Sequence, residues 1–283
     1  MKVQEDEWTL EITPRSSLFA LNLKNIWRYR DLLLLFVKRD IVTFYKQTIL
    51  GPLWFVIQPI LTTLIFMVVF GKIAKLSTDG LPPVLFYLSG IVIWNYFSEC
   101  IRATSGTFTA NEDIFGKVYF PRVIVPLSTV IANLIRFGIQ LALFLLILAY
   151  HVWQGVVVDP SWWVLLFPLL IALVAGLSLG FGMIVSSLTT KYRDMTFLVT
   201  FGIQLAMYAT PVIYPLSEAP EKYRALILAN PMSPIIEAFR YTVLGAGSFN
   251  GLSLAYSAGF TVVVLILGLL VFNRTEKTFM DVV

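Results

Sequence analysis

Few residues in this 283-residue chain have side chains suited to covalent chemistry or metal binding. It contains one cysteine, Cys100, and one histidine, His151, so neither a multi-cysteine metal site nor a histidine pair can form. No glycine-rich phosphate loop with its lysine is present, and no Ser/His/Asp or paired-carboxylate arrangement suggests a catalytic site. The sequence therefore predicts a protein that is not an enzyme and has no metal or cofactor of its own.

A polar stripe runs along the otherwise apolar segment 123–150. Four residues fall within about a 60° arc of one helix at 100° per residue: Thr129, Asn133, Arg136 and Gln140. An arginine near the middle of a membrane is costly unless it is paired or hydrated, so this face should meet protein or water. It could line a conduit, or form a hydrogen-bond network between helices with Glu99 as the partner of Arg136. Glu99 could instead pair with Arg102, three residues further on.

Aromatic residues form further stripes at helical spacing. Aromatic faces stack on sugar C–H groups while neighbouring polar groups bond hydroxyls, so these stripes suit a carbohydrate. Packing or lipid contact is the alternative, and it is the commoner use of aromatic residues in a membrane. We hypothesise that the stripes and the polar residues line a substrate canal: Phe55, Phe66, Tyr87, Trp94, Asn133, Arg136, Gln140, Phe197, Phe201, Gln204 and Tyr208.

The elements that must position these residues are predicted by composition. The chain is 58% hydrophobic and 13% charged, whereas a soluble domain has roughly 25% charged residues. A helix that spans a membrane needs about 20 mainly apolar residues. Six segments meet this requirement: 53–70, 84–104, 123–150, 162–188, 196–214 and 252–273. The predicted fold class is an all-α integral membrane protein with six transmembrane helices in residues 52–274.

The segment 23–51, before the first span, is basic and amphipathic at helical spacing. This pattern predicts a helix in the membrane–water interface with its cations near anionic headgroups, and the alternative is a surface helix of a soluble domain. Gly51-Pro52 should end the helix, because proline lacks a backbone N–H and disfavours a helical residue before it. Residues 1–22 are expected to form a cytosolic N-terminal arm.

Charge distribution predicts the topology. Most of the 21 Lys and Arg residues would face the cytoplasm if the N-terminus were inside, so both termini are expected there, with 275–283 as a cytosolic tail. The inner loop should contain a short helix at about 111–121, where Asn111 can act as the N-cap. Two amphipathic pieces within about 220–245 predict a re-entrant pair of outer helices, with a surface loop as the alternative.

Five stretches resemble, in order and spacing, the membrane subunits of polysaccharide-exporting ABC transporters, which export O-antigen, capsule or teichoic acid. The resemblance covers about residues 20–275. The stretches are WRYRDLLLLFVKRDIVTFYKQTILGPLWFVIQPILTTLIFMVVFG, LPPVLFYLSGIVIWNYF, NEDIFGKVYFPRVIVPLS, KYRDM and NPMSPIIEAFRYTVLG.

The resemblance implies a homodimer in the bacterial inner membrane, with two separate ATP-binding subunits that hold ATP and magnesium on the cytoplasmic face. It implies that 24–50 is a gate helix, that 111–121 is a coupling helix, and that helices at about 220–229 and 234–245 line the exit. The implied substrate is a glycan on an undecaprenyl-pyrophosphate-type lipid, which would pass through a canal between the two subunits. The residues implied to couple to the ATPase are Asn111, Glu112, Asp113, Ile114, Phe115 and Lys117.

We assign a pyrophosphate-binding role, by charge and position, to five cations of the gate helix: Arg28, Arg30, Lys38, Arg39 and Lys46. Attraction to ordinary anionic membrane lipid is the alternative role. The predicted function is the permease subunit of an ABC exporter of lipid-linked O-antigen-type polysaccharide. Export of teichoic acid or capsule, a secondary carrier and an intramembrane glycan-processing enzyme are the other possibilities. No nucleic-acid partner is expected.

Overall fold

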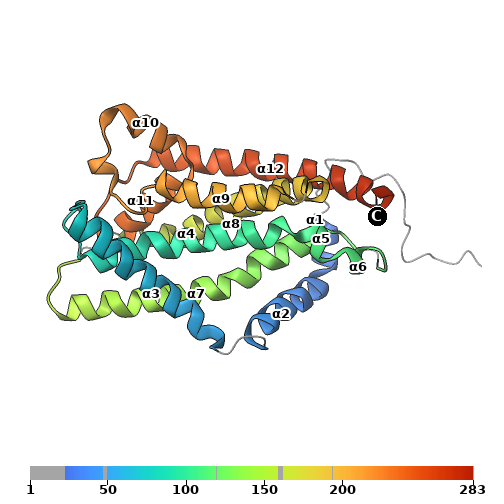
Figure 1. The fold of residues 1–283 in the computed structure, drawn as a ribbon, viewed down its shortest axis with the longest axis horizontal. Coiled ribbons are helices and arrows are strands. Elements are labelled where there is room, and N and C mark those ends of the chain that lie inside the picture. The colour runs from blue at the N-terminus through green and yellow to red at the C-terminus, as the bar shows by residue number, and fades with distance from the viewer. Residues whose placement is uncertain (1–22, 47–49, 119, 159–161, 193, 283) are drawn as a thin grey trace, which may run out of the picture.

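The computed structural model describes residues 23–46, 50–118, 120–158, 162–192 and 194–282, and every regular element within them is a helix. Four long helices run side by side along the axis of a bundle (Figure 1). They are α4 (Pro83–Ser105), α7 (Ile124–Trp153), α8 (Phe167–Lys191) and α12 (Gly251–Val282). α8 packs against both α4 and α12, and α4 also packs against α7, so α4 and α8 form the centre of the bundle.

Within the described residues, five helical segments are long and apolar enough to cross a membrane: Gly51–Ile73, Pro83–Ser105, Ile124–Trp153, Trp162–Lys191 and Gly251–Lys277. They match five of the six predicted spans. The remaining prediction, 196–214, corresponds to α9 (Met195–Tyr208), a helix of 14 residues. At 1.5 Å per residue α9 is about 21 Å long, shorter than the hydrocarbon core of about 30 Å. The count of six spans is therefore not confirmed.

α9 ends at Tyr208 because a buried arginine holds the following residues in a turn. Arg240 Nη1 donates a hydrogen bond to the carbonyl oxygen of Pro211, and Arg240 Nη2 donates one to that of Val212 at 2.9 Å. Pro211 has no N–H with which to continue a helix. The predicted continuation of this helix to residue 214 is therefore wrong.

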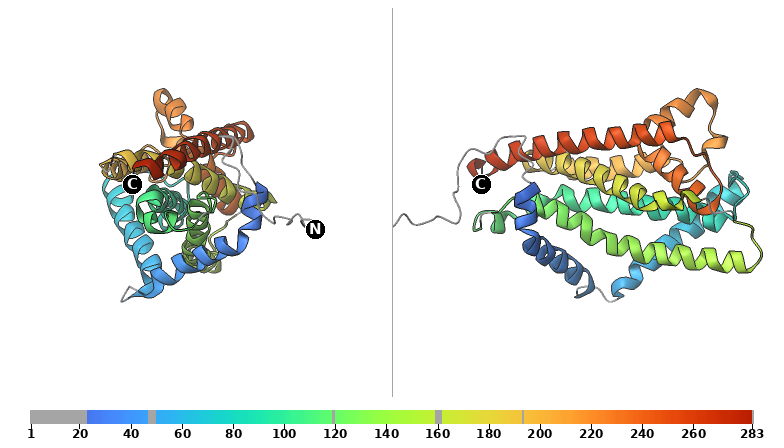
Figure 2. Two further views of the ribbon diagram at one scale, coloured as in Figure 1. Left: turned by 90° about the vertical axis from the view of Figure 1, so that its right-hand side faces the viewer. Right: turned by 180° about the vertical axis from the view of Figure 1, so that it is seen from behind.

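The predicted gate helix consists of two helices, α1 (Leu23–Arg28) and α2 (Arg30–Lys46). A 3-10 turn (Gly51–Leu53) leads into α3 (Trp54–Phe66), which passes into a π-helical stretch (Met67–Ile73). As expected, the chain turns at Gly51, whose φ of 50° is a left-handed conformation that favours glycine. Viewed along the bundle axis, α2 and α3 lie along two outer sides of the bundle (Figure 2).

The predicted coupling helix at 111–121 is shorter than expected and is preceded by another helical turn. The two turns are α5 (Thr107–Ala110) and α6 (Glu112–Phe115). Asn111 occupies the N-cap position of α6, but its side chain makes no cap hydrogen bond. Its Nδ2 instead donates to the carbonyl oxygen of Thr107 at 2.9 Å, so the predicted cap is wrong.

Both amphipathic pieces of the outer connection form helices. A 3-10 turn (Leu216–Glu218) leads to α10 (Glu221–Ala229) and α11 (Met232–Leu244), and a similar turn (Trp162–Leu166) precedes α8. α10 buries no residue, whereas α11 is buried along most of its length. α10 and α11 lie at one end of the bundle, and α5, α6 and the C-terminus lie at the other (Figure 1).

The two predicted terminal segments have different outcomes. The predicted arm, residues 1–22, lies outside the described residues. The predicted tail, 275–283, is not a separate segment, because α12 continues without a break through these positions to Val282.

Glycines bring the backbones of α8 and α12 into close contact. A Cβ atom on Gly268 would lie 2.5 Å from the carbonyl oxygen of Gly180, closer than real Cβ contacts allow. On the α4 side, a Cβ on Gly182 would lie 2.6 Å from Thr104 Cβ. Gly176 and Gly180 have the four-residue spacing of small residues that lets membrane helices approach closely. The crossing of α8 and α12 therefore depends on the absence of side chains at these positions.

At the end of the bundle that holds α10 and α11, an ion pair between Arg240 and Glu237 is buried, with 1% and 2% of the two side chains exposed and 3.3 Å between Nη1 and Oε1. The guanidinium stacks 3.8 Å from the ring centroid of Phe86, and its Nε donates to Ser89 Oγ at 3.3 Å. Burial lowers the pKa of Arg240 to about 10, and the Glu237 carboxylate opposes that shift. Arg240 therefore keeps its charge at neutral pH and ties α11 to α4.

We predict that Gly268→Ala destabilises the protein by about 1–3 kcal/mol, the usual cost of overpacking. The new methyl group would collide with the Gly180 carbonyl. Gly259→Ala, on the same helix, is the matched control, since a Cβ there has no neighbour within 4 Å. The measurement is thermal unfolding of the purified protein in detergent. Equal melting temperatures for the two variants would contradict the close crossing of α8 and α12.

A second prediction concerns the buried ion pair. Arg240→Met and Glu237→Met should each cost about 3–5 kcal/mol, because each leaves one buried charge without its partner. The double variant should lose clearly less than the sum of the two single losses. Denaturant titrations of the four proteins give the coupling free energy, and Lys222→Met, on the exposed helix α10, is the control. Additive losses would mean that the two side chains do not stabilise one another.

Candidate functional site

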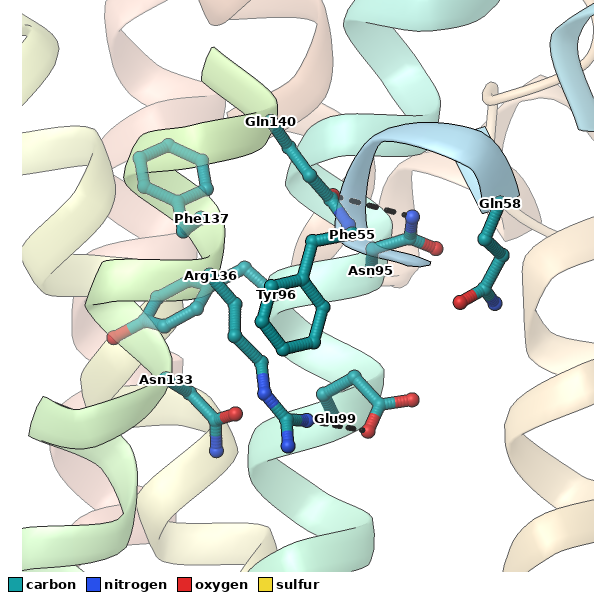
Figure 3. Close-up of a pocket in the computed structure, with 9 residues that line it drawn as sticks. All are labelled: Phe55, Gln58, Asn95, Tyr96, Glu99, Asn133, Arg136, Phe137 and Gln140. Carbon is teal, nitrogen blue, oxygen red and sulfur yellow. Dashed lines mark hydrogen bonds and ion pairs between the residues drawn. The ribbon is translucent and has the colours of Figure 1, made fainter. Parts of the chain in front are cut away.

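A polar cavity of about 100 Å³ lies between α3, α4 and α7 (Figure 3). All three helices belong to segments long and apolar enough to cross a membrane. The residues that line the cavity are Phe55, Gln58, Asn95, Tyr96, Glu99, Asn133, Arg136, Phe137 and Gln140. Three of the residues predicted from the polar stripe on α7, together with Phe55 on α3, are thus brought into one site.

Glu99 is the charged centre of the cavity. Its Oε2 lies 3.4 Å from Arg136 Nη1, and its Oε1 lies 3.2 Å from Arg102 Nη1. Both pairings expected from the sequence are therefore present. The Arg136 guanidinium also lies 4.9 Å from the ring centroid of Phe55, within the range of a cation–π contact. The carboxylate on α4 thus compensates a positive charge that would be costly in a membrane.

Amide side chains supply the remaining polar groups. Asn95 Nδ2 donates to Gln140 Oε1 at 3.3 Å, which links α4 to α7 (Figure 3). Asn133 Nδ2 donates to the carbonyl oxygen of Thr129 at 3.0 Å. Asn133 Oδ1 is buried and accepts no hydrogen bond from any described residue. A buried acceptor without a donor is unfavourable, so this atom is a local energetic cost of the arrangement around the cavity.

The side chains that line the cavity are suited to binding a polar ligand, and none of them is suited to covalent catalysis. Glu99 is held between two arginines, and the other polar side chains are amides and a phenol. Amides, carboxylates and guanidinium groups complement the hydroxyl groups of a polar ligand, and the rings of Phe55 and Phe137 offer apolar faces. The α7 stripe therefore forms the predicted contacts between helices and also lines a cavity, while its role in a conduit stays a prediction.

The predicted canal aromatics divide into three groups. Phe55 lines the cavity. Phe66, Tyr87 and Trp94 are at most 7% exposed and belong to the hydrophobic core of this one chain, so they line no open surface. These three residues pack inside the chain and do not form a canal wall, which corrects their assignment. Tyr87 and Trp94 lie on α4, which its neighbouring helices enclose, and Phe66 of α3 packs against Tyr87. The third group forms an exposed stripe on α9, away from the cavity: Phe197, Phe201, Gln204 and Tyr208.

The predicted gate cations also separate. Four of them are exposed along α1 and α2: Arg28, Arg30, Lys38 and Lys46. Arg39 is turned toward the loop between α4 and α7, where its Nη2 lies 2.8 Å from Asp40 Oδ1 and its Nη1 donates to Asn111 Oδ1 at 3.2 Å. Its guanidinium is thus engaged by groups of the protein itself, and with 39% of the side chain exposed its assignment to pyrophosphate stays a prediction.

The predicted coupling segment has an outer and an inner side. Glu112, Asp113 and Lys117 are exposed, and Ile114 is partly buried. Phe115 is 4% exposed and Asn111 is 8% exposed. These two residues hold the segment to the bundle and cannot contact another subunit directly, which corrects their assignment. Phe115 belongs to a buried aromatic-rich cluster, here called the α6 cluster: Phe36, Phe108, Phe115, Phe120, Ile124, Val125, Met183 and Phe272.

Five residues that line the cavity were missing from the predicted canal: Gln58, Asn95, Tyr96, Glu99 and Phe137. Of these, only Glu99 was considered from the sequence, as an ion-pair partner of Arg136 or Arg102. Asn95 precedes Glu99 by four residues, so helical spacing places it on the same face of α4. Gln58 follows Phe55 by three residues and shares its face of α3 in the same way. Helical spacing alone therefore places Asn95 and Gln58 beside residues that the sequence already distinguishes.

Known proteins resemble this chain over most of its length. It is 30% identical to the O-antigen export system permease protein RfbA of Myxococcus xanthus over 77% of this chain and 82% of that protein. It is 28% identical to a protein of the same name from Klebsiella pneumoniae, over 93% and 99% of the two chains. It is 27% identical to the polysialic acid transport protein KpsM of Escherichia coli, over 84% and 91%.

The polar cavity and the loop between α4 and α7, which contains α5 and α6, lie within one region of family similarity. Residues 31–244 match the family described as ABC-2 type transporter. This match covers well over half of the chain and includes every residue that lines the cavity. The chain is therefore a multi-pass membrane protein that belongs to the ABC-2 type transporter family.

Proposed function

We propose that this chain is the permease subunit of an ATP-driven exporter of lipid-linked polysaccharide, with an O-antigen-type glycan as substrate. The observation that carries the proposal is the charge-balanced polar cavity between α3, α4 and α7, in a chain whose relatives are named as O-antigen and capsule exporters. Its amides and aromatic rings suit sugar hydroxyls and C–H groups. A capsule polysaccharide is the second candidate, because relatives named for polysialic acid and capsule export match most of the chain.

The energy for export would come from two separate ATP-binding subunits, which would carry the ATP and magnesium. The sequence contains no glycine-rich phosphate loop with its lysine. The exposed side of the loop between α4 and α7, with Glu112, Asp113 and Lys117, is the docking surface that we assign to them. The inner side of that loop packs into the α6 cluster, so a movement of α6 would be transmitted to α2 and α12.

The canal would lie between two copies of the chain in the inner membrane. Support comes from α3, which covers the cavity yet has exposed apolar residues on its outer face, among them Leu61, Leu64 and Ile65. The exposed aromatic stripe on α9 is a second face suited to this contact or to lipid. The C-terminus lies at the same end as α1, α5 and α6, which favours a cytoplasmic position for both termini (Figure 1).

The exposed cations of α1 and α2 would meet the lipid pyrophosphate as it enters. Arg28, Arg30, Lys38 and Lys46 are free of the inward contacts that hold Arg39. Ordinary anionic lipid would attract the same charges, so the two roles differ only in their preference for pyrophosphate. Replacing all four by glutamine should weaken binding of undecaprenyl-pyrophosphate to the protein in nanodiscs more than it weakens binding of phosphatidylglycerol. If binding of both lipids weakened equally, these cations would serve only to attract anionic membrane lipid, and the pyrophosphate role would be wrong.

The whole proposal is tested by reconstitution with the ATP-binding subunit of the same organism. Vesicles that contain both proteins and the host's lipid-linked glycan should move the glycan across the membrane only when ATP is present. Glu112→Lys with Asp113→Lys should reduce co-purification of the ATPase by about tenfold, since each reversal opposes a complementary charge at the interface. The matched control is Glu221→Lys, which reverses an exposed charge at the opposite end of the bundle.

Transport in the absence of any ATP-binding subunit would contradict the proposed energy source and favour a secondary carrier. If the variant with both Glu112→Lys and Asp113→Lys still bound the ATPase, the proposed docking surface would be wrong, and the proposed energy source would be unaffected.

A further prediction concerns the cavity. Arg136→Met should slow export by about tenfold, a loss of roughly 1.4 kcal/mol of substrate or conformational stabilisation. Arg102→Met is the matched control, since it removes the other arginine on Glu99, whose side chain is 42% exposed against 16% for Arg136. Export is measured as surface polysaccharide in cells that express equal amounts of each variant. Equal export by the two variants would show that the cavity does not contact the moving glycan.

A further inference from the structure

A second polar cavity, of 350 Å³, lies at the end of the bundle that holds α10 and α11. We propose that this outer cavity binds one neutral sugar residue of the glycan as it leaves the canal. The inference rests on the proposed polysaccharide substrate, but it concerns a site separate from the cavity on α3, α4 and α7. The residues that line it are Asp79, Ser217, Arg224, Glu237, Gly245, Ala246, Gly247 and Ser248.

Three separate segments of the chain build the outer cavity: the loop before α4, the stretch from Ser217 to α10, and α11 with the loop after it. Asp79 has a φ of 51°, an uncommon left-handed conformation for a residue other than glycine. Its Oδ1 accepts a hydrogen bond of 2.6 Å from Ser217 Oγ, 138 positions along the chain. This contact fixes the carboxylate of Asp79 on one side of the cavity.

The opposite wall is also fixed by hydrogen bonds. Glu237 Oε1 accepts from Arg240 Nη1 at 3.3 Å, and Glu237 Oε2 accepts from the backbone N–H of Ser248 at 3.1 Å. Gly247, with a φ of 104°, brings the loop over this carboxylate, where a Cβ would lie 3.2 Å from Oε2. The side chain of Glu237 is 2% exposed, so the wall is rigid and faces the cavity with a defined set of polar groups.

The charges around the outer cavity favour a neutral ligand. The carboxylates of Asp79 and Glu237 are matched by the guanidinium groups of Arg224 and, behind Glu237, Arg240. A metal ion would be repelled by Arg224, and a phosphate would be repelled by Asp79. A sugar hydroxyl both donates and accepts, so it can bond to a carboxylate and a guanidinium at the same time. The balanced set of groups therefore suits a polyhydroxylated, uncharged ring.

Size and position agree with this ligand. The volume of 350 Å³ falls at the lower end of the roughly 300–1,000 Å³ that small-molecule sites occupy. The outer cavity lies at the opposite end of the bundle from α5 and α6, where the proposed ATP-binding subunits dock (Figure 1). A weak sugar site at this end would hold a released portion of the glycan and oppose its return into the canal.

The test uses the full transporter with its ATP-binding subunit in nanodiscs. The probe is the set of neutral oligosaccharides released by mild acid from the host's lipid-linked glycan, and binding is measured by saturation-transfer NMR and calorimetry. Asp79→Asn and Arg224→Gln should each weaken binding by about tenfold, since each removes one charge-assisted hydrogen bond. Lys222→Gln, which changes an exposed cation on the same helix as Arg224, should bind as the unmodified protein does.

Asparagine at position 79 keeps an oxygen that can accept from Ser217, so the fold should persist, and an unchanged melting temperature checks this. No oligosaccharide binding to the unmodified protein, or equal binding by all variants, would overturn the sugar site. Binding of calcium or inorganic phosphate that Asp79→Asn or Arg224→Gln abolishes, without sugar binding, would overturn it as well. ATP-dependent export is measured separately, in vesicles of the same lipid composition as the nanodiscs. The proposed function is therefore tested independently of the outer cavity.

Discussion

The buried ion pair of Arg240 and Glu237 is the interaction that holds together the end of the bundle where α10 and α11 lie. The guanidinium bonds to carbonyl oxygens of the turn after α9 and of α4, and it leaves so little room that a Cβ on Gly90 would lie 2.8 Å from Nη2. Glu237 in turn receives the N–H of Ser248. A single charged pair thus sets where α9 ends, how α11 sits on α4 and how one wall of the outer cavity is formed.

The same physical solution appears at a second level of the bundle. Arg136 in α7 can occupy a segment long enough to cross a membrane because Glu99 in α4 compensates its charge. In both places the pairing leaves polar groups facing a cavity instead of filling it. Both cavities therefore present carboxylate and guanidinium groups in balance, a character suited to uncharged sugars and poorly suited to ions.

At the end of the bundle that holds α5 and α6 the interactions are mainly apolar. Phe36 of α2, Phe115 of α6 and Phe272 of α12 belong to one buried cluster, and Arg39 adds a hydrogen bond to Asn111 beside it. A displacement of the short helix α6 would therefore be transmitted by direct contact to both α2 and α12. Close-packed protein interiors have low compressibility, so such a junction would transmit small shifts.

The sequence by itself determined the fold class, the break at Gly51 and the polar stripe on α7, because these follow from composition and helical spacing. It offered Arg136 and Arg102 as alternative partners of Glu99, and the structure shows both pairs. It also contained the spacing of Gly176 and Gly180, whose meaning becomes clear only when α12 is seen against α8. Where α9 ends and which aromatic residues are buried depended on contacts between segments far apart in the chain.

The tertiary structure alone decided which of the predicted residues face a cavity. Helical periodicity places Phe55 and Phe66 within one apolar segment, but only the packing of α3 on α4 and α7 puts Phe55 at the cavity and Phe66 in the core. The outer cavity had no signal in the sequence, since Asp79, in the loop before α4, and Glu237, in α11, are more than 150 positions apart in the chain. Periodicity describes one helix at a time, whereas burial and charge compensation are properties of several helices together.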